Sequence, residues 1–178
     1  MTKYQSSFWT TACALATIGV ILLVVATAGC VSSPAETATD AAIKELLAAV
    51  EAQDIGLGNI TNVGSGFVDG EFVVYSSDPA GLTYAHEKFV ESAEHVERAK
   101  QYLGEARQNM YVDDSENLLR NGRMFQAALV VGDIAQRGIS LTSELWQPSP
   151  NATACMVDAG LICRYLPERD DMLRRAGL

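Results

Sequence analysis

The fold class is decided by residues 85–106, AHEKFVESAEHVERAKQYLGEA. Large apolar side chains recur at every seventh position in and just after this stretch: Phe89, Val96, Leu103 and Met110. Small side chains fall between them, at Ala85, Ser92, Ala99 and Ala106. A seven-residue repeat of this kind forms a continuous seam along one face of a helix. Because alternate positions are small, a second helix can approach closely, and the seam predicts packing inside a helical bundle.

The seam belongs to a long helix whose start is marked by Asp78 as a cap and Pro79 at the first helical position. We expect this helix to end near Tyr111. A second long helix is expected from Ser115 to about Arg137, with Gly138 as its C-cap. Its buried face is predicted at Leu118, Gly122, Phe125, Leu129 and Gly132, widened by Ala128, Val131 and Ile134. The two helices would form an antiparallel hairpin.

Shorter elements are expected on either side of this hairpin. An amphipathic helix is predicted from Glu36 to about Asp54, ended by Gly56 and Gly58, with a loop to Gly66. Residues 67–75 carry Asp-Gly between β-prone runs, which predicts a small β-hairpin that must pack on helices. A helix over 152–166 and a short one over 168–176, separated by Pro167, complete the chain. The predicted fold is therefore mainly α, a bundle of about four helices with a small inserted β-hairpin, preceded by an N-terminal hydrophobic helix.

Charge restricts the classes of partner. The chain has a net charge of −9, and Lys3 is the only charged side chain before Glu36. The remainder carries 22 acidic against 12 basic side chains, a net charge of −10. A phosphate backbone would be repelled, so nucleic acid is not expected as a partner. An anionic lipid surface would also repel this part, so contact with a membrane is expected through the N-terminal segment alone.

The N-terminal segment has no charged side chain from Tyr4 to Ala35, and its apolar stretch is long enough to cross a bilayer as a helix. It ends in Ala28-Gly29-Cys30, which resembles the end of the prokaryotic lipobox. The resemblance covers residues 1–30 and implies that Cys30 becomes a lipidated N-terminus. An uncleaved membrane anchor and a plain cleaved secretory signal remain alternatives. All three export the rest of the chain, which divides into a signal or anchor (1–30), a polar tether (31–37) and an extracytoplasmic helical domain (38–178).

Candidate chemical sites are sparse. His86 and His95 are nine residues apart, so they lie on opposite faces of one helix and cannot share a metal there. Glu87, Glu91 and Glu94 favour a solvated acidic face, and no metal site or cofactor is expected. Tyr102, Tyr111, Phe125, Trp146 and Tyr165 are candidates for lining a pocket, although core or boundary packing is the favoured interpretation.

Cys155 and Cys163 present two open alternatives. Eight residues of helix place them about 12 Å apart, whereas a disulfide needs Cα atoms within about 7 Å, so a bond requires a break near Gly160. Two buried free thiols are the other possibility. Asn59-Ile60-Thr61 and Asn151-Ala152-Thr153 are glycosylation sequons in predicted loops, so Asn59 and Asn151 are candidate glycosylation sites.

Three functions remain open after these observations. The first is a non-enzymatic, membrane-anchored domain at the outer face of the cell membrane that binds another envelope protein or supports an envelope assembly. The second is a sensory or small-molecule-binding helical bundle. The third is an extracytoplasmic hydrolase, which would need a cleft with a histidine beside a nucleophile.

Overall fold

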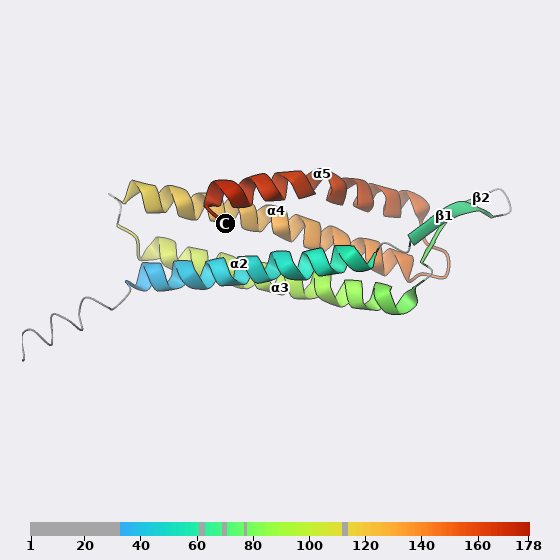
Figure 1. The fold of residues 1–178 in the computed structure, drawn as a ribbon, viewed down its shortest axis with the longest axis horizontal. Helices are drawn as coiled ribbons and strands as arrows, with labels where there is room; N and C mark the ends of the chain where they lie inside the picture. Colours follow the sequence, from blue (N-terminus) through green and yellow to red (C-terminus); the bar gives the residue numbers. More distant parts are fainter. Residues whose placement is uncertain (1–32, 61–62, 69–70, 77, 112–113) are drawn as a thin grey trace, which may run out of the picture. The chain divides into compact units, whose positions relative to one another are not determined.

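The structure, a computed structural model, describes residues 33–60, 63–68, 71–76, 78–111 and 114–178. These residues form the following elements: α2 (Pro34–Asn59), β1 (Val63–Val68), β2 (Glu71–Ser76), α3 (Pro79–Gln108), α4 (Ser115–Leu145) and α5 (Ala152–Ala176). In Figure 1 the four helices lie side by side, with α2 beside α3, α4 beside α5, and the β-hairpin at the end of the bundle where α2 ends and α3 begins. The prediction of a mainly α fold with about four helices and a small inserted β-hairpin is confirmed. The expected N-terminal hydrophobic helix and residues 31–32 of the expected tether lie outside the described residues, and residues 34–37 belong to α2.

The predicted seam on α3 is buried as expected. Phe89, Val96 and Leu103 are at most 2 % exposed, and the four small positions between them are completely enclosed. The facing helix α2 has a matching alternation, because Ala42, Ala49 and Gly56 recur every seven residues with Leu46 and Gln53 between them, all buried. Large side chains of one helix therefore lie beside small ones of the other. The hydroxyl of Ser92 donates a hydrogen bond to the carbonyl of Ala49 at 2.8 Å, which ties the two backbones together within the seam.

Phe89 sets the spacing of three helices. Its ring is fully buried between Gly56 of α2 and Gly138 of α4. A Cβ placed on Gly56 would meet the ring at 3.2 Å, and one placed on Gly138 would overlap it. The prediction that Gly138 ends its helix was wrong, because α4 continues to Leu145. The glycine is needed for room beside Phe89.

The predicted buried face of α4 was wrong at its centre, while Leu118 and Gly132 at its two ends are partly buried. Phe125 and Leu129 are 40 % and 47 % exposed, and Gly122 is exposed. The buried residues follow a second stripe rotated around the helix: Asn121, Met124, Ala128, Val131, Ala135, Gly138, Thr142 and Leu145. The three residues expected to widen the predicted face, Ala128, Val131 and Ile134, lie in the core. Both stripes have the alternating spacing of three and four residues that packs against a helix, so spacing alone did not identify the inward one.

Two other predicted boundaries were wrong. Helix α2 continues through Gly56 and Gly58 to Asn59, because Gly56 gains close contact with α3. Helix α5 continues through Pro167, where two helices were expected. The N–H that proline lacks would have bonded the carbonyl of Cys163. Cys163 and Pro167 are both exposed, so water can bind that carbonyl.

The β-hairpin packs on the end of the bundle. Strands β1 and β2 pair in antiparallel register with Val68 opposite Glu71, which is the pairing that the predicted two-residue Asp-Gly turn requires. Residues 69–70 themselves lie outside the described residues. Val74 is 7 % exposed and packs in a core cluster with Leu141 and Leu145 of α4. The hairpin is therefore held by the helices, as a two-stranded sheet requires.

The apolar core runs along the whole bundle in two clusters. One contains residues of all four helices and is rich in alanine, and the other joins β2 to α3, α4 and α5. Among the helices of the described residues, none combines the length and apolar character that crossing a bilayer requires.

We expect Gly138→Ala to lower the free energy of unfolding by about 1–2 kcal/mol, because the added methyl group overpacks against the enclosed Phe89 ring and this exceeds the gain in helix propensity. Gly104→Ala is the matched control, since Gly104 is also inside a helix and a Cβ there meets nothing within 4 Å. This variant should be about 0.5–1 kcal/mol more stable than the parent. Urea unfolding followed by circular dichroism measures both. A stabilising Gly138→Ala would contradict the account of Phe89.

Candidate functional site

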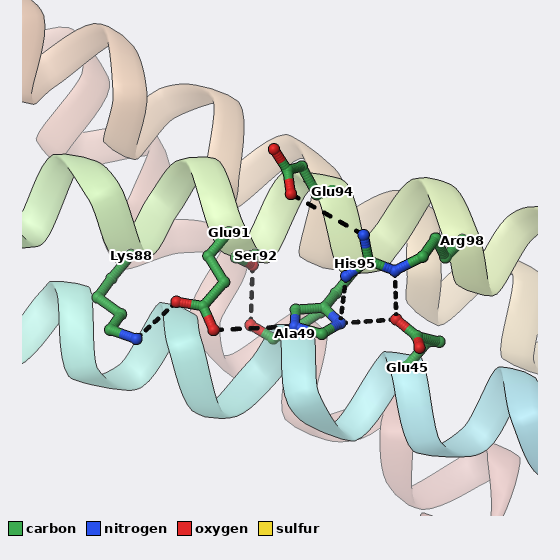
Figure 2. Close-up of polar contacts among 8 residues, drawn as sticks. All are labelled: Glu45, Ala49, Lys88, Glu91, Ser92, Glu94, His95 and Arg98. Carbon is green, nitrogen blue, oxygen red and sulfur yellow. Dashed lines mark hydrogen bonds and ion pairs between the residues drawn. The ribbon is translucent and has the colours of Figure 1, made fainter.

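The most conspicuous polar cluster lies across α2 and α3 (Figure 2). His95 places Nδ1 2.6 Å from Oε2 of Glu45, and Arg98 donates from Nε to the same oxygen at 2.8 Å. Since a carboxylate oxygen only accepts, the contact with Glu45 requires a proton on Nδ1 of His95. Nη2 of Arg98 lies 2.9 Å from the same nitrogen and, with that proton in place, is a close neighbour and not a donor to it. On the far side of His95, Nε2 lies 3.9 Å from Oε1 of Glu91, whose other oxygen accepts from Lys88 at 2.5 Å. Glu45 thus receives two donors from α3, and a chain of polar contacts runs along the surface of both helices.

This cluster holds its carboxylates in the charged form. The hydrogen bond from Arg98, with a further contribution from His95, holds the pKa of Glu45 below its ordinary value, against the opposing effect of partial burial. Lys88 in the same way lowers the pKa of Glu91. A general acid or base near neutral pH needs a carboxyl pKa shifted upward instead. The cluster is therefore suited to joining α2 to α3 and not to proton transfer.

The predicted solvated acidic face is partly confirmed. Glu87 and Glu94 are exposed, whereas Glu91 and His95 take part in the cluster across α2 and α3. Among the described residues, no group of three or more histidine, cysteine, aspartate or glutamate side chains is arranged to hold a metal ion.

The other histidine is placed beside a hydroxyl group. His86 Nδ1 lies 2.8 Å from Oγ1 of Thr142, and its ring packs against Trp146 with centroids 4.5 Å apart and the ring planes tilted by 40°. Thr142 is fully buried and donates its hydroxyl proton to the carbonyl of Gly138 at 2.8 Å. The hydroxyl group therefore accepts from His86 and is not activated by it. This arrangement lacks the accessible nucleophile that a hydrolase requires.

A buried polar network that the sequence did not indicate joins three helices. Arg169 of α5 is 7 % exposed and donates to Oε1 of Gln53 at 3.0 Å and to Asp54 at 2.5 Å. The amide of Gln53, fully enclosed, donates to the carbonyl of Val131 in α4 at 3.0 Å. The one available signal was that Gln53 takes a large position in the heptad alternation of α2, where an apolar residue is usual. The network fixes the register of α5 against α2 and α4.

Of the cysteines singled out in the sequence, the structure describes the two on α5, Cys155 and Cys163. Cys30 lies outside the described residues. Cys155 is a buried free thiol and Cys163 an exposed one, and α5 continues through Gly160 without the break that a disulfide would need. Burial raises the pKa of the Cys155 thiol, and the charges of Glu144 and Asp158 raise it further. Cys155 is therefore held as a protonated thiol, and its reaction with electrophiles is slowed but not abolished.

The two sequon asparagines both serve helix ends. Asn59 is the last residue of α2, and its amide donates to the carbonyl of Ile55 at 2.8 Å. Asn151 is exposed and caps α5 by accepting from the backbone N–H of Ala154 at 3.1 Å. Their glycosylation stays a prediction.

The exposed stripe on α4 is the largest departure from the expected burial pattern. It runs through Leu118, Gly122, Phe125, Leu129 and Gly132, and we call it the outer seam. Gly122, Phe125 and Leu129 are exposed, Leu118 is partly buried, and Gly132 ends the seam close to Val96 of α3. Phe125 and Leu129 are each close to half exposed, and a Cβ on Gly122 would meet nothing within 4 Å. The spacing of four, three, four and three residues matches the seam that one helix presents to another.

The five aromatic residues considered as a pocket lining do not line the apolar cavity that lies between the β-hairpin, α4 and α5. Tyr111, Phe125 and Trp146 are exposed on the surface, and Tyr102 and Tyr165 are partly buried.

No family model matches the chain, and comparisons with curated proteins and with solved structures give no match either. The candidate function therefore rests on the chain's own side chains.

The cluster of Glu45, His95 and Arg98, called the Glu45 cluster below, makes the free energy of unfolding depend on pH in a defined direction. Because its folded-state pKa is lowered, Glu45 stabilises the fold above its unfolded-state pKa of about 4.3, and that stability is lost as the pH falls through the folded-state pKa. Glu45→Gln should lower the free energy of unfolding by about 1 kcal/mol at pH 7, and this difference from the parent should become smaller towards about pH 3. Urea unfolding across this range checks it. Glu87→Gln, which removes an exposed glutamate from α3, is the control. If the difference in free energy of unfolding between Glu45→Gln and the parent does not become smaller in acid, the interpretation is refuted.

Proposed function

We propose that the chain is a membrane-anchored extracytoplasmic protein without enzymatic activity, whose helical domain binds an amphipathic helix of another envelope protein. The outer seam of α4 is the observation that carries this proposal. Its apolar side chains have helix-packing spacing, and its exposed part, from Gly122 to Leu129, faces away from the stripe of α4 on which the chain's own bundle packs. A helix laid along the outer seam would bury Phe125 and Leu129, and the exposed Gly122 leaves room for close approach of its backbone.

A helix fits this surface better than an extended peptide or a small molecule does. An extended peptide pairs with the free edge of a sheet, whereas the outer seam lies on a helix whose backbone groups are already bonded. A small molecule needs a concave pocket, whereas the exposed side chains of the outer seam lie in a line along one helix. Ridges of apolar side chains at alternating spacings of three and four residues pack against a second helix.

The non-enzymatic part of the proposal is supported by the state of the polar side chains. The hydroxyl beside His86 is enclosed and already donates to a backbone carbonyl, and the carboxyls beside His95 have lowered pKa values. The structure gives the hydrolase interpretation no support among the described residues.

The anchoring part of the proposal is supported by the sequence alone. The segment that precedes the bundle is uncharged from Tyr4 to Ala35 and carries Ala28-Gly29-Cys30. We propose that Cys30 is lipidated and that the domain is held on the extracytoplasmic side of the cell membrane. An uncleaved hydrophobic helix is the alternative that would hold it there as well.

The outer seam can be tested by photocrosslinking in native membranes. A photoreactive amino acid in place of Leu129 should give a discrete adduct, whereas the same residue in place of Leu47 should not. Leu47 is a matched control because it is 48 % exposed on α2, against 47 % for Leu129. The mass of the adduct separates a different protein from a second copy of this chain.

A further substitution shows whether the adduct depends on the apolar surface. Phe125→Glu should remove the Leu129 adduct by placing a charge in the contact, while the protein keeps a cooperative thermal transition because the side chain is 40 % exposed. Equal crosslinking from positions 47 and 129, or no adduct from either, would count against the proposed binding surface. An adduct with a second copy of the chain would replace the envelope partner by self-association.

The anchor is tested by the intact mass of the protein extracted from membranes. The parent should have the mass of a chain beginning at Cys30 plus attached lipid, and Cys30→Ala should lose both the cleavage and the lipid. A full-length mass in both proteins would reject lipidation in favour of the uncleaved helix. A mass cleaved without lipid in both would leave the domain unanchored and refute this part of the proposal.

A further inference from the structure

A cavity of about 250 Å³ lies where the β-hairpin meets α4 and α5. Its walls come from Ile60 and Val63 before and on β1, Val74 on β2, Leu141 and Leu145 on α4, and Met156 on α5. Met156 is 55 % exposed and marks the mouth of the cavity. The cavity is separate from the outer seam, so what it binds is independent of the proposed partner.

The cavity exists because the residues of α5 that face the hairpin are small. Cys155 and Ala159 both line it, and they are followed one turn later by the buried Ile162. On the hairpin, Gly64 lines the cavity, and the ring of Tyr75 occupies the space where a Cβ on Gly64 would stand. The space opens to solvent beside Met156, so it is an apolar cleft at the surface that a ligand can enter directly.

The lining is chemically uniform. None of its side chains carries a charge, and Cys155, the only lining side chain with a polar hydrogen, is a protonated thiol. A carboxylate, phosphate or ammonium group would gain no ionic partner from the lining and would lose its water. An aliphatic chain leaves no polar group unpaired on entering such a space. An apolar cavity of about 150 Å³ holds benzene, so by proportion this cavity holds roughly ten carbon atoms.

We propose that this cavity binds the aliphatic end of a small amphiphile, a chain of roughly ten carbons whose polar head stays at the mouth beside Met156. The class is set by the lining: hydrocarbon inside, and one polar end in water. Aliphatic molecules with a polar group at both ends are excluded, because the inner polar group would find no hydrogen-bond partner.

The thiols of α5 give a direct readout of occupancy. Cys155 lines the cavity and Cys163 is exposed on the same helix, so a bound chain should protect the first and not the second. The full-length protein is placed in lipid nanodiscs and treated with N-ethylmaleimide, and the modification rate of each cysteine is followed by mass spectrometry of its peptide. Saturating n-decanol should slow the modification of Cys155 at least tenfold and leave the rate at Cys163 unchanged.

Two comparisons make the result specific. The decane diol with a hydroxyl at each end has the same chain length. At equal concentration, the factor by which it slows the modification of Cys155 should be at least ten times smaller than the factor for n-decanol. Ala159→Met fills the cavity and should make the Cys155 rate insensitive to decanol, whereas Ala154→Met, the same change on another face of α5, should keep the response.

Three results would overturn the proposal. They are an unchanged Cys155 rate in the parent with decanol, equal protection by the alcohol and the diol, and protection that persists in Ala159→Met. The alcohol and diol comparison uses the parent protein, so it decides the question even if Ala159→Met does not fold.

Discussion

The structure depends on the contact of one aromatic ring with two glycines. Phe89 is enclosed between Gly56 of α2 and Gly138 of α4, and neither position has room for a larger residue without displacing the ring. Close approach at this level fixes the distances among three helices, and the alanines along α2 and α3 continue the same spacing towards the other end of the bundle. Both glycines lie inside helices, where glycine costs conformational entropy, and the contact with Phe89 is the gain that offsets this cost.

Polar contacts add register to the spacing that small residues allow. An alanine-rich seam is smooth, so helices that pack through it can slide with little loss of apolar contact. Bonds to fixed positions prevent this: Ser92 to the carbonyl of Ala49, and Gln53 to the carbonyl of Val131 and to Arg169. Because an unpaired buried amide or guanidinium is costly, shifted arrangements that break these bonds are disfavoured. The Glu45 cluster gives a similar constraint at the surface of α2 and α3.

Two apolar surfaces are left over once the bundle is closed, and they differ in kind. The outer seam of α4 is a linear helix face whose central side chains, Phe125 and Leu129, are close to half exposed, and it is suited to a second helix. The cavity beneath the β-hairpin is concave and uncharged, suited to a hydrocarbon chain. An amphiphile in the cavity would contact the hairpin and α5, and the proposed partner would contact α4, so the two can be occupied together.

The sequence by itself determined the elements and their approximate ends, because these depend on local signals. The seam of Phe89, Val96 and Leu103, the cap at Asp78 and the hairpin turn between Val68 and Glu71 were all predicted and confirmed. Local signals misled at Gly138 and Pro167, where glycine and proline usually end a helix but tertiary contacts and solvent allowed it to continue. The structure alone decided which stripe of α4 faces inward, since both stripes have the same period and differ only in what lies opposite. It also decided the Gln53–Arg169 network and the cavity, which join residues from distant parts of the chain and leave no periodic trace in the sequence.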